Sequence, residues 1–393
     1  MENILDGVKV VSLEHMEAAP AASVWLADWG AEVIKVESLQ GERWRGGSKV
    51  ADNWAFQLLN RNKKSLSVNL TTSQGRNILN NLIKKSDVFI SNYQPDTLKK
   101  LKADYDSLNE VNRSIIYALL TGYGTKGPDK DERAYDFTAA WARAGFQYIM
   151  GEPGNAPVRQ RGGMMDRTAA SHVVAGICAA LLHKERTGKG QLVEVSLYHS
   201  AVWTLALDIE LCLMGRPAAK RSRDNPVTPM INSYHAKDGR WFQLAMPSNN
   251  DTWINIFKII EKPELETDPR FSSYQARREN TGELVRILDE AFKSKTVDEW
   301  ERLFKEYKFI FSIIKSPAEV ITDPQAIANG FFTEIDHPEG KIKLINTPVR
   351  FVQNPALVRN PAPEIGQDTD DILLDLGYSP EDIATKREQG IIS

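Results

Sequence analysis

The sequence predicts an α/β protein whose larger part is a Rossmann-like, doubly wound parallel sheet. Short runs rich in β-branched residues alternate with amphipathic or small-residue segments of helical length through about the first 200 residues. The first strand, helix and strand fit into fewer than 40 residues, which suits a βαβ unit. The chain of 393 residues is also long enough to bury a large core.

The expected elements follow in chain order. Strands at 8–13 and 31–37 enclose a helix at 21–29, with Pro20 as a favourable first residue and Gly30 as the stop signal. The remaining elements of this part are helices at 74–85, 96–101, 168–186 and 198–214 and strands at 87–90, 114–120 and 193–197. The helix at 168–186 is apolar on most faces, so we expect it to be buried. The alternation favours a parallel sheet with helices on both sides.

Composition changes mark the domain limits. The basic, proline-rich stretch 216–229 predicts a linker between a large domain at 1–215 and a smaller α+β domain at 230–330. In the smaller domain, an Asp-Gly turn predicts a β-hairpin. The tail 331–393 contains a short predicted strand, TPVRF, and a helix near 369–376. Because this tail is too short for an independent domain, we expect it to return and pack on the large domain.

Composition also argues against several classes of function. With 49 basic and 52 acidic residues, the net charge of −3 offers no basic excess for nucleic acid or an anionic membrane. Two cysteines are too few for a disulfide scaffold, and the six histidines lack metal-ligand spacing. No apolar run reaches the length of a membrane span. We therefore expect a cytoplasmic protein with no metal, no nucleic-acid partner and no membrane partner.

A nicotinamide-dependent oxidoreductase is one alternative for a Rossmann-like chain. The second strand ends in Glu37, where an acid that binds ribose would lie. The first strand–helix turn, LEHMEAAPAAS, lacks the G-x-G-x-x-G pattern that allows a pyrophosphate to approach the backbone. The missing glycines argue against NAD binding.

Asp166 is the main candidate for a catalytic residue. It follows two glycines and two methionines and lies just before the predicted helix at 168–186. As a helix cap it would be structural, because Asp is favoured at that position. As a nucleophile it would be ionised at neutral pH with its ordinary pKa of ~3.9, and nearby N–H groups would stabilise an oxyanion. The pattern alone leaves both interpretations open.

Several stretches together resemble family III CoA-transferases, a CaiB/BaiF-like group that includes formyl-CoA, carnitine and 2-hydroxyacyl-CoA transferases. The stretches are LDGVKVVSLEHMEAAPAAS, LADWGAEVIKVES with GERWR, LNRNKKSLSVNLTTSQGR, SDVFISNYQPDTLKKL, TGYGTKGPDKD, TGKGQLVEVSLYHSA and GQDTDDILLDLGYSPEDI. Their order and spacing cover nearly the whole chain.

The resemblance implies an enzyme that moves CoA from an acyl-CoA donor to a free carboxylic acid. Asp166 matches the catalytic aspartate of the family. Its carboxylate would form a mixed anhydride with the donor acyl group and then an aspartyl-CoA thioester, which the acceptor carboxylate attacks. The CoA thioester is a co-substrate in this scheme, and the resemblance implies no permanently bound cofactor.

The resemblance also assigns substrate- and CoA-binding positions. These positions are His15, Glu17, Arg45, Val68, Leu70, Asn92, Tyr93, Lys100, Arg133 and Tyr135. Lys100 and Arg133 match residues that bind phosphate, although a lysine at position 100 lacks the bidentate fork of arginine. Arg45 could supply charge where Ser38 replaces a basic residue of some family members.

Finer comparison within the family favours a 2-hydroxy acid as the acceptor. The chain is most similar to the phenyllactate and 2-hydroxyisocaproate CoA-transferases, and it lacks the glycine-rich loop of the formyl-CoA transferases. Related racemases carry a catalytic histidine where this chain has Tyr135. A racemase and a non-catalytic acyl-CoA-binding protein are the alternatives within the fold. The family also implies an interlocked homodimer.

Overall fold

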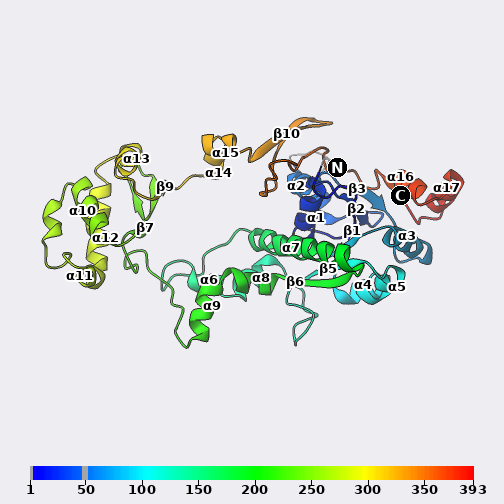
Figure 1. Ribbon diagram of the computed structural model, residues 1–393, viewed down its shortest axis with the longest axis horizontal. Coiled ribbons are helices and arrows are strands. Elements are labelled where there is room, and N and C mark those ends of the chain that lie inside the picture. Colours follow the sequence, from blue (N-terminus) through cyan, green and yellow to red (C-terminus); the bar gives the residue numbers. More distant parts are fainter. Residues whose placement is uncertain (1–2, 47–51) are drawn as a thin grey trace. The chain divides into compact units, whose positions relative to one another are not determined.

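The chain folds into two compact units in a computed structural model that describes residues 3–46 and 52–393 (Figure 1). Unit 1 comprises Met1–Phe146, Arg159–Arg216 and Pro324–Ser393. Unit 2 comprises Gln147–Val158 and Pro217–Asp323. Unit 1 therefore combines the C-terminal tail with most of the N-terminal half of the chain.

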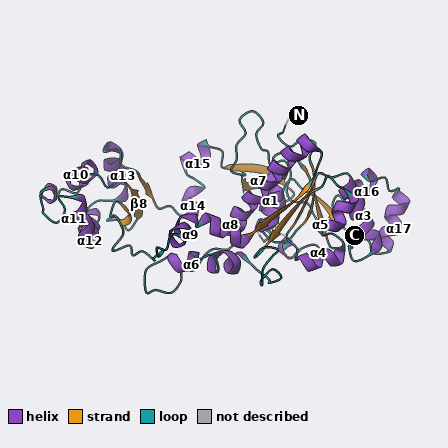
Figure 2. Ribbon diagram, turned by 60° about the horizontal axis from the view of Figure 1, so that its bottom comes forward, coloured by secondary structure: helices purple, strands orange, loops and turns teal. Residues whose placement is uncertain are grey.

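Unit 1 is built on a six-stranded parallel sheet with the order β3-β2-β1-β4-β5-β6 (Figure 2). The strands are β1 (Lys9–Leu13), β2 (Glu32–Glu37), β3 (Lys64–Ser67), β4 (Val88–Ser91), β5 (Ile116–Thr121) and β6 (Gln191–Ser196). Successive strands are added on one side of β1 up to β3 and on its other side from β4 onward, so the strand order reverses between β1 and β4. Ligands of such sheets bind at this point, beyond the carboxyl ends of the strands. The α/β prediction with a parallel sheet is confirmed.

Alternation along the strands sends side chains into two separate cores. On β1, Val10 belongs to one core and Val11 to the other, as expected for a strand buried on both faces. The first core is covered by α1 (Ala18–Asp28), α2 (Trp54–Asn60) and α7 (Met164–Thr187). The second is covered by α3 (Ser73–Lys84), α4 (Pro95–Leu101), α5 (Tyr105–Val111), α16 (Thr369–Asp375) and α17 (Pro380–Glu388).

Helices α1 and α7 differ in their starts from the prediction. Helix α1 begins at Ala18, so Pro20 lies inside its first turn rather than at its first position. Helix α7 begins at Met164, and only one of its faces is buried in this chain. The expectation that this helix is buried was therefore wrong for its other faces, where apolar residues such as Leu182 are exposed.

The remaining elements of unit 1 are short helices, turns and one strand pair that connect or follow the strands of the sheet. They are η1 (Arg43–Arg45), the π-helical turn η2 (Asp136–Ala142), α8 (Leu197–Thr204), α9 (Ala206–Leu213), α15 (Pro324–Ala328), β10 (Phe332–His337) and β11 (Gly340–Ile345). Helix α6 (Phe146–Ile149) begins at the last residue of the first segment of unit 1, and its other residues belong to unit 2. Strands β10 and β11 form an antiparallel pair.

Two predicted elements of unit 1 were wrong. The helix expected at 198–214 is two helices that meet at Leu205, and the Thr204 hydroxyl bonds back to the Ser200 carbonyl, a contact that bends helices. The stretch TPVRF is not a strand. Pro348 cannot donate to a ladder, and Phe351 packs edge-on against Trp29 with ring centroids 5.1 Å apart.

The C-terminal tail covers the β3 edge of the sheet. The Ser65 amide donates to the Asp368 carboxylate at 2.8 Å, and the Ser67 amide donates to the Thr369 hydroxyl at 3.2 Å. Ile372 is buried in the core shared with α3 and α5. These contacts satisfy an edge that would otherwise expose unpaired backbone groups.

Unit 2 is a small α+β unit with its own core. The antiparallel strands β7 (Ile231–His235), β8 (Trp241–Ala245) and β9 (Phe311–Ile313) pack with α10 (Asn250–Ile259), η3 (Pro263–Glu266), α11 (Tyr274–Glu279), α12 (Thr281–Phe292), α13 (Val297–Glu306) and α14 (Pro317–Val320). The predicted hairpin is confirmed, and Gly239 supplies the positive φ of +82° that its turn requires.

Among the helices of the described residues, none combines the length and the hydropathy needed to cross a membrane.

Candidate active site

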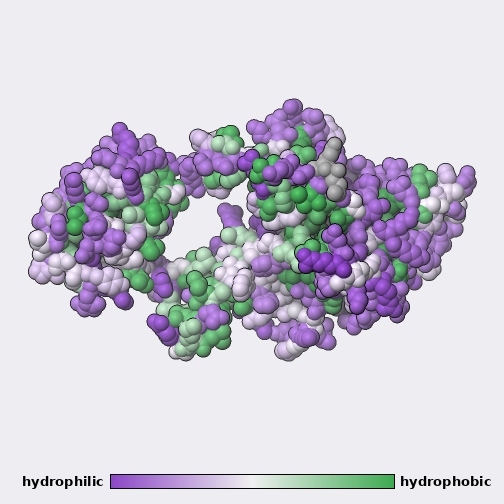
Figure 3. All heavy atoms as spheres, viewed as in Figure 1, coloured by the Kyte–Doolittle hydropathy of each residue, from purple (hydrophilic) through white to green (hydrophobic). Residues whose placement is uncertain are grey.

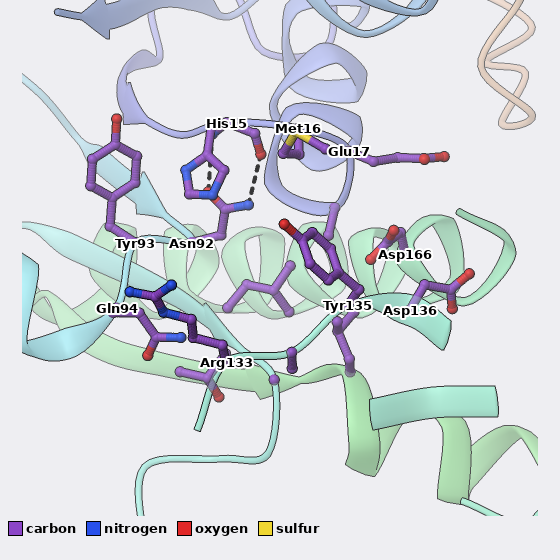
Figure 4. Close-up of a pocket in the computed structure, with 16 residues that line it drawn as sticks. His15, Met16, Glu17, Asn92, Tyr93, Gln94, Arg133, Tyr135, Asp136 and Asp166 are labelled. Carbon is purple, nitrogen blue, oxygen red and sulfur yellow. Dashed lines mark hydrogen bonds between the residues drawn. The ribbon is translucent and has the colours of Figure 1, made fainter. Parts of the chain in front are cut away.

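A cavity of about 270 Å³ lies at the point where the sheet order reverses (Figure 4). Its walls come from the segments that follow β1, β4 and β5 and from the start of α7. The lining residues are His15, Met16, Glu17, Ala18, Asn92, Tyr93, Gln94, Leu120, Thr121, Gly122, Arg133, Ala134, Tyr135, Asp136, Asp166 and Leu197. All of them belong to unit 1.

The loops after β1 and β4 are held together by two reciprocal hydrogen bonds. The His15 amide donates to Asn92 Oδ1 at 3.1 Å, and Asn92 Nδ2 donates to the His15 carbonyl at 2.9 Å (Figure 4). The His15 ring meets the Tyr93 ring edge-on at 4.9 Å. Burial lowers the pKa of His15, so the imidazole is neutral at physiological pH.

The next residue of this loop, Met16, has a left-handed backbone conformation with φ +63°. A residue with a side chain adopts this region only when its surroundings impose it. Its amide donates to the Glu42 carboxylate at 2.7 Å. This bond fixes the peptide that carries Glu17 into the cavity wall.

A buried network of two lysines and two glutamates supports that contact. Lys35 lies 2.7 Å from Glu42 and 3.9 Å from Glu14, and Lys63 lies 2.7 Å from Glu14. Burial alone would raise the pKa of Glu14, but Lys63 and Lys35 outweigh it and the pKa is lowered. Burial lowers the pKa of Lys63 to about 8 despite Glu14. The network therefore stays charged at neutral pH, and its Glu42 carboxylate holds the loop that follows β1.

Three carboxyl groups gather at one end of the cavity. Burial, followed by the charges of Asp136 and Glu17, raises the pKa of Asp166 to about 7, and Arg167 opposes this only in part. Burial also raises the pKa of Glu17 and of Asp136. The expectation of an Asp166 with an ordinary pKa was wrong, because the sequence does not show that the other two carboxyls converge on it.

The start of α7 places Asp166 inside the helix. Gly163, with φ +77°, is the capping residue, so Asp166 belongs to the first turn and is not the cap. A Cβ atom on Gly163 would lie 1.9 Å from a Glu17 carboxylate oxygen, and only glycine fits there. Burial raises the pKa of Asp136, and the backbone N–H groups of Gly163, Met164 and Met165 at the start of α7 partly oppose this.

The structure brings together most of the residues that the resemblance assigned. Those that line the cavity are His15, Glu17, Asn92, Tyr93, Arg133, Tyr135 and Asp166. Arg133 lies at the opposite end from Asp166 and Asp136 in Figure 4. Tyr135 is 60% exposed and lies between these ends.

Four assigned residues do not line the cavity. Arg45 contacts the Glu37 carboxylate and donates to the Pro363 carbonyl at 2.9 Å, so its charge is already paired. Val68 and Leu70 are buried in the core on the α3 face. Lys100 is exposed on α4.

Sequence reasoning missed Asp136, Met16 and Gln94, which also line the cavity. The signal for Asp136 was present, because an acidic residue directly follows the assigned Tyr135. Asp136 is 3% exposed and starts the π-helical turn η2, a type of turn that is frequent at functional sites. Within the described residues, no group of three or more His, Cys, Asp or Glu side chains is arranged to hold a metal ion.

Comparison with known proteins identifies the family. The model of CoA-transferase family III matches residues 5–369. The chain belongs to this family. It is 37% identical to (R)-2-hydroxy-4-methylpentanoate CoA-transferase of Clostridioides difficile over 99% of both chains. It is 32% identical to cinnamoyl-CoA:phenyllactate CoA-transferase of Clostridium sporogenes over 97% of this chain and 95% of that one.

Solved structures agree with this assignment. A CAIB/BAIF family protein from Brucella suis superposes with a TM-score of 0.85 at 28% identity and covers 96% of this chain and 100% of its own. A protein from Mycobacterium tuberculosis superposes with a TM-score of 0.82 at 30% identity, over 94% and 99% of the two chains. The chain is therefore a family III CoA-transferase, and the alternative of a nicotinamide oxidoreductase is not supported.

Proposed function

We propose that this family III CoA-transferase transfers CoA from an acyl-CoA donor to a 2-hydroxy carboxylic acid, with Asp166 as the nucleophile. The observation that carries the proposal is the half-buried Asp166 carboxyl, which lines the cavity at the switch point of the sheet together with Asp136. Two relatives named for transfer to 2-hydroxy-4-methylpentanoate and phenyllactate support the acceptor class.

The proposed reaction proceeds through Asp166 in four displacements. The ionised carboxylate attacks the donor thioester carbonyl, which forms a mixed anhydride and releases the CoA thiolate. The thiolate attacks the Asp166 carbonyl, releases the donor acid and leaves an aspartyl-CoA thioester. The acceptor carboxylate then displaces the thiolate to form a second anhydride. The thiolate finally attacks the acceptor carbonyl, which gives the acceptor-CoA and restores Asp166.

The environment of Asp166 supports a nucleophilic role. With a pKa of about 7, a large fraction of Asp166 is ionised at neutral pH, so no separate base has to remove a proton. The burial and neighbouring charges that raise this pKa also make the carboxylate less stable and therefore more reactive. CoA is a good leaving group because thiols have a pKa of ~8.5.

The charge distribution along the cavity suggests how the CoA thioester lies. Arg133 is exposed at the end away from Asp166, where a CoA phosphate can reach it from solvent. The thioester would then point toward Asp166. His15, Asn92, Tyr93 and Tyr135 also line this cavity, and we propose them as substrate-binding residues. We retain Lys100 as a further phosphate-binding candidate on the exposed face of α4.

A racemase would need a second base near Asp166. Tyr135 occupies the position where racemases carry their histidine. A tyrosine at this position does not supply the imidazole that would act as the second base. This residue favours CoA transfer over racemisation.

We also propose an interlocked homodimer. Helices α8 and α9 carry large apolar side chains that the described residues leave exposed: Trp203 is 69% exposed, Leu207 89% and Leu213 74%. Figure 3 shows the hydrophobic surface over α9. A monomer rarely leaves so many large apolar side chains in water on adjacent helices. A second copy of the chain would cover them.

A transfer assay tests the function. Purified protein is incubated with one acyl-CoA and a panel of free acids that includes lactate, 2-hydroxy-4-methylpentanoate, phenyllactate, oxalate and carnitine, and new acyl-CoA species are measured by mass spectrometry. We expect transfer to 2-hydroxy acids and none by Asp166→Ala. Transfer to none of the 2-hydroxy acids, or full transfer by a folded Asp166→Ala variant, would contradict the proposal.

A further inference from the structure

A second, larger cavity of about 680 Å³ adjoins the active site within unit 1. It lies among α1, α2, α7 and the segment that follows β11. Its described lining residues are Glu17, Ala21, Val24, Trp25, Trp44, Trp54, Ala55, Leu58, Leu59, Arg61, Gly162, Arg167, Thr168, Ser171, Ile345, Asn346, Thr347 and Pro348. Three tryptophans and several aliphatic side chains make it apolar, and its volume is in the range of small-molecule sites.

Glu17 connects the two cavities. It lines both of them, whereas Asp166 lines only the active-site cavity and Arg167 only the apolar one. The Glu17 carboxylate forms an ion pair with the Arg167 guanidinium. Because Asp166 and Arg167 are consecutive on α7, their side chains leave the helix about 100° apart around its axis. The Glu17–Arg167 pair therefore lies at the boundary where the active-site cavity and the apolar cavity adjoin.

The positive charge of Arg167 partly offsets the negative charges of the carboxyl groups at this boundary. The acceptor is an anion, and it has to approach a place where Glu17 and Asp136 already raise the pKa of Asp166. Arg167 is the cation that lowers this pKa. Its side chain is 51% exposed, so it has donors that a further carboxylate can reach. Arginine binds carboxylates through paired N–H groups and fixes their orientation.

We propose that the apolar cavity binds the side chain of the acceptor acid while Arg167 binds its carboxylate next to Asp166. The proposal rests on the transferase function and adds a substrate class, namely carboxylic acids with a bulky branched or aromatic side chain. The cavity walls supply tryptophan rings that suit such groups. A small acid such as lactate reaches Arg167 but leaves the cavity unfilled.

Filling the cavity tests the side-chain site. Ser171 lines the cavity from α7, and Ser171→Phe would occupy part of it. We expect the ratio of kcat/KM for phenyllactate to kcat/KM for lactate to fall at least about 10-fold, because a few methylene-sized groups carry that much discrimination. The matched control is Glu185→Phe at an exposed position of the same helix, which should keep the wild-type ratio.

Arg167 has its own test. Arg167→Gln should raise the KM for every acceptor acid about 10-fold or more, whatever its size, with a much smaller change in the KM for the acyl-CoA donor. The donor carbonyl carries no charge, so it gains less from the guanidinium. Arg167→Lys should restore part of the acceptor affinity, since the charge is kept and the fork is lost.

The outcomes separate this proposal from the proposed function. If the wild type transfers CoA to no acid, the function itself is wrong. If the wild type transfers CoA but Ser171→Phe keeps the wild-type ratio, only the cavity assignment is wrong.

A change in the oligomeric mass of Ser171→Phe without a change in the ratio would assign the cavity to a second chain and overturn the proposal. If Ser171→Phe does not fold, Trp54→Ala removes a 65% exposed ring from the cavity wall and should weaken the preference for phenyllactate.

Discussion

Replacing Asp166 with asparagine should stabilise the fold at alkaline pH while it abolishes transfer. Asparagine has nearly the same shape as aspartate but cannot ionise. In the folded protein the pKa of Asp166 is raised from its ordinary value of 3.8 to about 7 by burial and by Asp136 and Glu17. Such a difference corresponds to about 4 kcal/mol against the ionised form.

The sign of the effect follows from proton binding. Between pH 4 and 7 the folded protein holds a proton on Asp166 that the unfolded chain has released, so the stability of the wild type falls as the pH rises through this window. At pH 8 Asp166→Asn avoids the whole cost, and we expect a gain in the free energy of unfolding of up to about 4 kcal/mol. Near pH 4 the carboxyl is neutral in the folded protein, and the gain should nearly vanish.

Urea unfolding of wild type and Asp166→Asn at pH 4 and pH 8, followed by circular dichroism, measures this difference. Asp298→Asn provides the control, because it makes the same chemical change at an exposed position of α13, outside the residues that line the cavity. The same titration should appear in the wild-type kcat/KM, which should rise with pH around 7. Equal stability of wild type and Asp166→Asn at both pH values would refute the electrostatic reasoning.

Three further predictions concern the surroundings of the site. Arg133→Ala should weaken acyl-CoA binding, measured by isothermal titration calorimetry, and the loss should be larger at low salt than at high salt. The loss should also exceed that of Lys100→Ala, because Arg133 lines the cavity and Lys100 does not. Unchanged affinity would show that Arg133 does not bind the CoA phosphates. Glu14→Gln removes the negative charge 2.7 Å from the buried Lys63 ammonium and should cost about 3–5 kcal/mol of unfolding free energy in urea titrations. The control Glu32→Gln removes a partly exposed ion pair and should cost less than about 1 kcal/mol, and equal costs would contradict this account. Finally, light scattering over a dilution series should show a dimer even at nanomolar protein, whereas a folded and active monomer would exclude the interlocked arrangement.

Strands β1, β4 and β5 of the large sheet could be predicted because their sequences are nearly continuous runs of buried, mostly apolar residues. Residues 8–13 and 87–90 read as strands from composition alone, and β1 and β4 lie there. Strand β3, with the sequence KSLS, was missed because two serines and a lysine interrupt the apolar signal. The break at Leu205 was missed for a similar reason, since hydropathy does not report a hydroxyl that bonds to the backbone.

The candidate site was predictable only through the resemblance. Asp166 has no local pattern that separates a nucleophile from a helix cap, and its raised pKa depends on Glu17 and Asp136, which are distant in the chain. The burial of Lys35 and Lys63 could not be predicted either, because lysines in a sequence are ordinarily interpreted as surface charges. Contacts between distant segments decide which charges are buried, and a single sequence does not contain them.

The central claim is that Asp166 becomes covalently attached to CoA, and peptide mass spectrometry tests it most directly. The protein is incubated with a donor acyl-CoA without acceptor, quenched in acid and digested, with Asp166→Asn treated in parallel. The account predicts that the peptide containing Asp166 gains the mass of CoA less one water, that hydroxylamine converts the adduct to a hydroxamate, and that the variant shows neither. An active wild-type enzyme without this adduct, or with the adduct on another residue, would contradict the account.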